Sequence, residues 1–161
     1  MMKSAILLRS LAVVIVLALA AGVGVLFYQY RQNEQTEQAR TDAVAAASAQ
    51  ATAMLAYDFD NVDQQLGSAA DGLTGDFKDE YTKLVTEVIA PSAKEKSLTV
   101  QVTVQGTAVV SADPDDATIL LFLNQITTST DAPDAASSGS RVRMTMEKVD
   151  GRWLASELAP I

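Results

Sequence analysis

The hydrophobic residues of this chain repeat with a helical period up to about residue 89 and with a period of two from residue 98 onward. Apolar residues spaced three, four and seven apart are typical of an amphipathic helix, and strict alternation is typical of a strand with one buried face. Two helical stripes precede the change: Val62, Leu66, Ala69 and Leu73, then Phe77, Tyr81, Leu84, Val85, Val88 and Ile89. We expect Pro91 to end or kink the second helix.

The segments after the change indicate an antiparallel meander. The predicted strands cover residues 98–112, 117–130, 141–149 and 152–158, with a turn at 113–116, a loop at 131–140 and a hairpin at Asp150-Gly151. Gly106 interrupts the first strand and suggests a bulge or bend there. Helices followed by consecutive strands predict an α+β fold, with helices packed on one face of a curved four-stranded antiparallel sheet.

A second feature lies at the N-terminus, where residues 11–28 carry no charged side chain. As a helix, this run would span about 27 Å, close to the thickness of a bilayer core. The preceding bases, Lys3 and Arg9, predict that residues 1–10 form a short cytoplasmic tail and that the rest of the chain lies outside the cytoplasm. The alternative is a cleaved signal peptide, with small residues for the protease at Ala18 to Ala20.

Residues 29–56 are rich in Gln, Ala, Glu and Arg and contain neither Gly nor Pro. These residues favour a helix. Because few of them are large and apolar, we expect a helical stalk that continues the membrane helix and buries little until its last turns. A flexible linker is the alternative. The extracytoplasmic α+β domain then covers residues 57–161.

The composition excludes several classes of function. The chain has no histidine and no cysteine, which removes the commonest general base, the commonest metal ligand and any thiolate site. A net charge of −8 argues against a nucleic-acid partner. We therefore expect no catalytic residue, no cofactor and no metal. An enzyme with Tyr57 and Asp58 as acid and base is the alternative, although adjacent residues seldom converge on one point.

The predicted stalk is followed by a cluster of acidic and aromatic residues: Tyr57, Asp58, Phe59 and Asp60. We interpret it as a structural joint, in which Asp58 or Asp60 caps the next helix and the aromatic rings plug into the core. The alternative is a cation site, because Asp58, Asp60 and Asp63 resemble the start of a calcium loop. The sixth and twelfth positions of such a loop require Gly and Glu, but hold Asp63 and Ala69 here.

Alternation along the strands also predicts two faces. One is a candidate partner face, although the same pattern fits a merely solvated surface; it consists of Thr99, Gln101, Thr103, Arg141 and Arg143. The other is an inward, apolar face that fits an ordinary core; if the fold leaves an apolar cavity, its candidate lining is Phe122, Met144, Met146 and Trp153.

Several motifs resemble the Mce-associated membrane proteins of actinobacteria. They are YDFDNVDQQL, LTGDF, VIAPSAKE, GTAVVSA, LLFLNQITTS and, most specifically, SGSRVRMTMEKVDGRWLASELAPI at the C-terminus. The resemblance covers nearly the whole chain. It implies a single-pass membrane anchor and a cone-like roll similar to nuclear transport factor 2 and to the assembly scaffold of type IV secretion systems.

The resemblance also implies a non-catalytic accessory role beside Mce transporters, which import lipids or sterols through a permease, an ATPase and a tube of Mce proteins. The expected partners are Mce proteins and permease subunits, and self-association is possible for such a domain. The alternative is an extracytoplasmic carrier that holds a lipid or sterol in a cavity between sheet and helices.

Overall fold

The computed structural model describes residues 22–23, 30–31, 34–130 and 135–161. The chain forms two compact units, Met1–Glu37 and Gln38–Ile161. The described residues of the first unit are helical. The predicted tail at 1–10 lies outside the described residues, and so does all of the predicted membrane helix at 11–28 except residues 22–23. No helix built from described residues combines the length and the hydropathy needed to cross a membrane.

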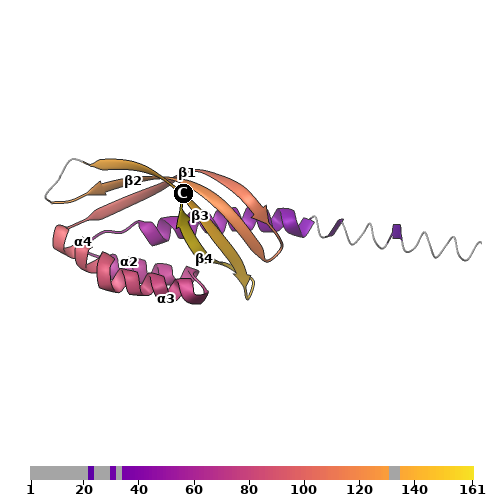
Figure 1. The fold of residues 1–161 in the computed structure, drawn as a ribbon, viewed down its shortest axis with the longest axis horizontal. Helices are drawn as coiled ribbons and strands as arrows, with labels where there is room; N and C mark the ends of the chain where they lie inside the picture. The colour runs from indigo at the N-terminus through magenta and orange to yellow at the C-terminus, as the bar shows by residue number, and fades with distance from the viewer. Residues whose placement is uncertain (1–21, 24–29, 32–33, 131–134) are drawn as a thin grey trace, which may run out of the picture. The chain divides into compact units, whose positions relative to one another are not determined.

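The second unit begins with helical residues 38–55 and continues through a set of short helices to a sheet (Figure 1). The short helices are α2 (Val62–Ala69), a 3-10 turn (Ala70–Gly72), α3 (Gly75–Leu84), a π-helical turn (Val85–Ile89) and α4 (Ala90–Lys96). The strands are β1 (Thr99–Ala112), β2 (Asp116–Thr128), β3 (Ala136–Val149) and β4 (Arg152–Pro160). The predicted α+β fold is therefore confirmed.

The four strands form an antiparallel sheet in the order β1-β2-β3-β4, as the meander prediction requires. Asp150 and Gly151 both have positive φ and join β3 to β4 as the predicted two-residue hairpin turn. β1 carries irregularities between Val104 and Gly106 and between Val109 and Ser111. The first of these lies at the expected glycine.

The core lies between one face of the sheet and the helices, which Figure 1 shows together on that side. On β2, Ile119 and Leu121 are fully buried, and on β3 so are Met144 and Met146. The helices contribute further side chains to the same cluster: Val62, Leu66, Leu73, Tyr81 and Val85. Alternation along β2 and β3 therefore separates an inner face from an outer face, as the pattern of β3 predicted.

The helix at residues 38–55 buries more than the sequence led us to expect. Ala43, Ala47 and Ala51, one turn apart, are fully buried in the core cluster, and Met54 joins them. This part of the predicted stalk therefore belongs to the folded unit. Alanine hides such packing from a search for large apolar residues, because a small side chain lets the helix backbone approach the core closely.

Of the two outcomes expected at Pro91, an end of the second helix is wrong, because helical residues run past it; the regular α-helix is instead interrupted just before the proline. Helical residues continue to Lys96, and Pro91 stands in the first turn of α4, where a missing N–H is tolerated. The π-helical turn before it widens the backbone just where the proline would otherwise clash. The helix ends at Ser97, which adopts a left-handed conformation with φ of 48°.

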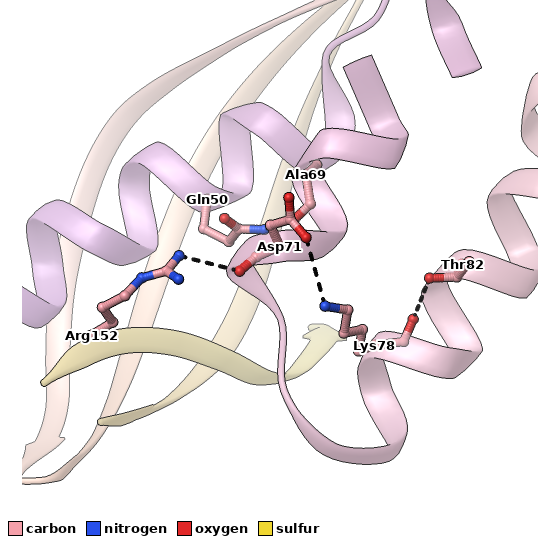
Figure 2. Close-up of polar contacts among 6 residues, drawn as sticks. All are labelled: Gln50, Ala69, Asp71, Lys78, Thr82 and Arg152. Atoms are coloured by element: carbon pink, nitrogen blue, oxygen red, sulfur yellow. Dashed lines mark hydrogen bonds and ion pairs between the residues drawn. The ribbon is translucent and has the colours of Figure 1, made fainter. Parts of the chain in front are cut away.

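Contacts from three elements hold the 3-10 turn in place (Figure 2). Gln50 donates a hydrogen bond from Nε2 to the Ala69 carbonyl at 2.7 Å. Arg152 of β4 donates to the Asp71 carbonyl at 3.3 Å, and Lys78 of α3 lies 3.7 Å from the Asp71 carboxylate. A Cβ atom at Gly72 would fall 1.8 Å from Gln50 Oε1, so a larger residue here would displace the end of the glutamine side chain.

Candidate interaction site on the outer face of the sheet

The predicted joint connects the helix ending at residue 55 with both β1 and α2. Tyr57 exchanges two backbone hydrogen bonds with Val100, at 3.0 and 2.8 Å, and so pairs with the start of β1. Burial raises the pKa of Tyr57. Phe59 is half-buried against the core cluster.

Asp58 stabilises a turn and does not cap α2 as we had expected. Its Oδ1 accepts the backbone N–H of Asp60 at 3.0 Å, and its Oδ2 accepts the hydroxyl of Thr99 at 3.2 Å. The residue that precedes α2 is Asn61, and no side chain caps the helix there. Asp58 also donates its own N–H to Gln65 Oε1 at 2.8 Å, which ties the turn to the first turns of α2.

The carboxylates of the joint do not gather in the way that the alternative cation site requires. Asp63 points to α4, where it forms an ion pair with Lys94. Within the described part of the chain, no group of three or more acidic residues is placed to hold a metal ion.

The predicted partner face is partly assembled by the structure. Gln101 and Thr103 on β1 and Arg141 and Arg143 on β3 are all exposed. Pairing through β2 places them on the same, outer face of the sheet. Thr99 is the exception, because it is half-buried and bonded to Asp58, and so belongs to the joint.

Of the predicted cavity lining, Met144, Met146 and Trp153 share the core side of the sheet, and Phe122 does not join them. Met144 and Met146 have no exposed surface, and Trp153 is half-buried with Lys148 Nζ 5.6 Å from its ring centre. Phe122 lies on the opposite face of the sheet and is 41% exposed. The inward position predicted for Phe122 is wrong because β2 is apolar on both faces around Leu121. The sequence of this strand therefore does not show which residues face the core.

Phe122 lies at the centre of the outer face, between two strands. Its cross-strand neighbours are Gly106 on β1 and Arg141 on β3, and the next outward residue toward the β1–β2 turn, Leu120, pairs with Arg143. A Cβ atom built at Gly106 would lie 3.9 Å from Phe122 Cδ2, an ordinary van der Waals contact, so the ring lies close to this glycine.

A groove of about 590 Å³ opens beside Phe122. Its lining comes from the three strands β1, β2 and β3: Gln105, Phe122, Leu123, Asn124, Gly139, Ser140 and Arg141. Gly139 explains the hollow, because the only neighbour within 4 Å of a Cβ atom built there would be the Leu123 carbonyl oxygen, at 4.0 Å. Sequence reasoning placed Gly139 in a loop and so missed this feature.

The groove offers binding chemistry more than acid–base chemistry. An aromatic ring, two amides, a hydroxyl and a guanidinium line it, and these groups bind through apolar contact and hydrogen bonds. Within the described part of the chain, the guanidinium groups of Arg141 and Arg143 have no hydrogen-bond or ion-pair partner. The hydroxyl oxygen of Ser140 is buried and likewise has no partner among those residues.

Solved structures share this fold at low sequence identity. An IcmL-like type IV secretion system protein from Legionella pneumophila aligns with a TM-score of 0.61 at 15% identity, covering 73% of this chain and 89% of that one. A periplasmic fragment of TraM gives 0.62 at 12% identity, over 75% and 96%. CagV, a VirB8 homologue from Helicobacter pylori, gives 0.56 at 6% identity, over 73% and 95%. These likenesses confirm the predicted type IV secretion-like fold and concern the fold alone.

Relatives are found in Mycobacterium tuberculosis. The "Outer membrane protein Rv1973" is 45% identical over 111 residues, which are 68% of each chain. The "Uncharacterized protein Rv1362c" is 39% identical over 109 residues, 68% of this chain, and the match spans half (50%) of that relative's length. Residues 4–159 match a single protein family. This chain therefore belongs to the family described as "Uncharacterized protein Rv1363c/MT1408-like".

Proposed function

We propose that this protein is a non-catalytic accessory subunit of the cell envelope, which supports an Mce-type lipid or sterol import complex by docking through the outer face of its sheet. The observation that carries the proposal is the groove beside Phe122, flanked by Arg141 and Arg143. Aromatic residues and arginine are enriched at protein interfaces and among the residues that dominate binding energy.

The envelope location is supported by three independent features. The uncharged run at residues 11–28 fits a single-pass anchor with a cytoplasmic N-terminus and an extracytoplasmic domain. A relative bears the name outer membrane protein, and a fold neighbour is a periplasmic fragment. The Mce partners, namely Mce proteins and permease subunits, are what the resemblance of the sequence motifs to Mce-associated proteins implies.

Docking through the face is favoured over strand addition at an edge. β1 is irregular at two places, and its first residues already pair with Tyr57. β4 has a bulge opposite Thr145 and Met146, is bridged to Leu73 and ends at Pro160. Bulges and proline prevent a regular ladder from forming with a second chain.

The carrier alternative has less support. The interior methionines that would line a lipid cavity are fully buried in one cluster with Leu66 and Leu73 of the helix layer. A buried side chain of this kind contacts neighbours on all sides, so the space it occupies is already filled.

The test is recovery of Mce components with the full chain from detergent extracts. Reversing both charges in Arg141→Glu/Arg143→Glu should abolish recovery and lower lipid uptake by cells, while circular dichroism and melting show an intact fold. The matched control, Lys83→Glu/Lys96→Glu, changes net charge equally on exposed helical residues and should behave like the parent. Recovery of Mce components at parental levels by the arginine variant would refute the role of this face.

A further inference from the structure

We infer that the groove receives an extended acidic protein segment that carries one large apolar side chain, with acids two and four residues away from it. The inference rests on the proposed docking role of this face and names the chemistry of the partner.

The spacing comes from β3 itself. Gly139, Arg141 and Arg143 lie on the outer face at every second position of one strand, with one inward residue between each pair. An extended segment rises about 3.3 Å per residue and repeats its side-chain direction every second residue, the same period as the strand beneath it. A segment that follows β3 therefore presents one side chain to each of the three positions.

Each position selects a different side chain. The hollow at Gly139, which Phe122 and Asn124 also line, leaves space above the glycine for an apolar side chain. Arg141 and Arg143 offer planar forks of donors that match carboxylates. The sequence of the partner segment is then apolar-x-acid-x-acid when it runs parallel to β3, and the reverse order when it runs antiparallel.

Charge limits the acidic part to two residues. Beyond Arg143, the next outward residue is Thr145, whose hydroxyl donates to the Glu157 carboxylate at 3.4 Å, and Glu147 follows. A third acid on the segment would face these carboxylates and be repelled. The two arginines thus form a local basic patch on a chain of net charge −8, which makes an acidic partner complementary to this face.

The test uses the full chain in nanodiscs of neutral lipid and fluorescein-labelled peptides of both orders, Ser-Leu-Ser-Glu-Ser-Glu-Ser and Ser-Glu-Ser-Glu-Ser-Leu-Ser, followed by anisotropy. We expect saturable binding of at least one order that weakens as salt rises. Lysine in place of both glutamates, or alanine in place of the leucine, should weaken binding at least tenfold.

Two protein variants, each with a matched control, test the arginines and the hollow separately. Arg141→Glu/Arg143→Glu should weaken peptide binding at least tenfold, whereas Lys83→Glu/Lys96→Glu should change it less than twofold. Gly139→Leu fills the hollow with only the Leu123 carbonyl oxygen close to its Cβ, so the chain should fold as before and bind at least tenfold more weakly. Gly67→Leu, placed on exposed α2 where a Cβ meets nothing, is the control for adding a leucine.

Absence of saturable binding by both orders would overturn the inference, as would binding that survives either the arginine variant or Gly139→Leu. Arginine-dependent flotation with phosphatidylglycerol vesicles, or an arginine-dependent dimer, without peptide binding would assign the face to a membrane or to a second copy and would also overturn it. Peptide binding without recovery of Mce components refutes the proposed function alone. Arginine-dependent recovery without peptide binding refutes the occupant alone.

Discussion

Replacement of Gly72 by alanine should destabilise this protein, although glycine-to-alanine changes in or near helices usually stabilise. The new Cβ would lie 1.8 Å from Gln50 Oε1 and 2.4 Å from its Cδ, so the glutamine must turn away and lose its 2.7 Å hydrogen bond to the Ala69 carbonyl. The lost bond costs about 0.5–1.5 kcal/mol. A glutamine forced off its preferred rotamer adds a further cost of about 0.5–1.5 kcal/mol.

Against these costs stands a gain of about 0.4–1 kcal/mol, because alanine restricts the unfolded chain. The two costs together are about 1–3 kcal/mol, so the net expectation is a loss of about 0–2.6 kcal/mol, centred on about 1.3 kcal/mol. In a Gln50→Ala background the obstacle is absent, so the same Gly72→Ala change should stabilise by about 0.4–1 kcal/mol. The sign of the effect therefore reverses, and the coupling free energy between the two positions should equal the lost costs, about 1–3 kcal/mol.

The measurement is urea unfolding of the four variants of this cycle, followed by the fluorescence of Trp153, the single tryptophan of the chain. Gly67→Ala is the reference, because its Cβ meets nothing and the change should raise the free energy of unfolding by about 1 kcal/mol. Equal effects of Gly72→Ala in the two backgrounds would refute the steric argument.

Three further expectations concern the core and the topology. Ala47→Leu should lower the free energy of unfolding by about 1–3 kcal/mol in thermal melts, because residue 47 is fully buried, whereas exposed Ala49→Leu should change it by less than about 0.5 kcal/mol; equal effects would contradict the packed helix. Burial raises the pKa of Tyr81 well above its usual value, so the unfolded chain releases this proton first and stability should fall as pH rises beyond about 10. Tyr81→Phe, which also loses the 3.1 Å bond to the Met54 carbonyl, should flatten that decline, and an unchanged alkaline profile would contradict the assignment. A reporter active only in the cytoplasm, fused after Ile161, should be silent, and activity there would reverse the proposed topology.

The sheet was predictable where the two faces of a strand differ in polarity. β1, β3 from Arg141 onward and the Asp150-Gly151 turn follow directly from alternation and turn chemistry. The first residues of β3, Ala136 to Ser140, look like a loop because Ser and Gly are poor strand formers. Their strand conformation comes from pairing with β2, which no local pattern reveals.

The groove was harder to predict than the sheet. Arg141 and Arg143 were recognisable as outward residues, but Phe122 was assigned to the interior because a large aromatic ring usually belongs there. Its true position depends on the register that pairs it with Gly106 and Arg141. Register is a long-range property, so the hollow at Gly139 appears only when three strands are brought together.

The alanine face of residues 38–55 has a mechanical consequence. Alanine contributes little apolar area, so each turn of this helix is held to the core by far less free energy than a turn bearing leucine. Any pull on the chain from residues before Gln38 enters the folded unit through this helix, and its early turns should yield first. Detachment of the helix from the core should stop near residue 55. There the Tyr81 hydroxyl donates to the Met54 carbonyl, and Tyr57 forms two backbone hydrogen bonds with Val100. The helix would then act as an extensible spring that lengthens under load while the sheet and its outer face keep their shape.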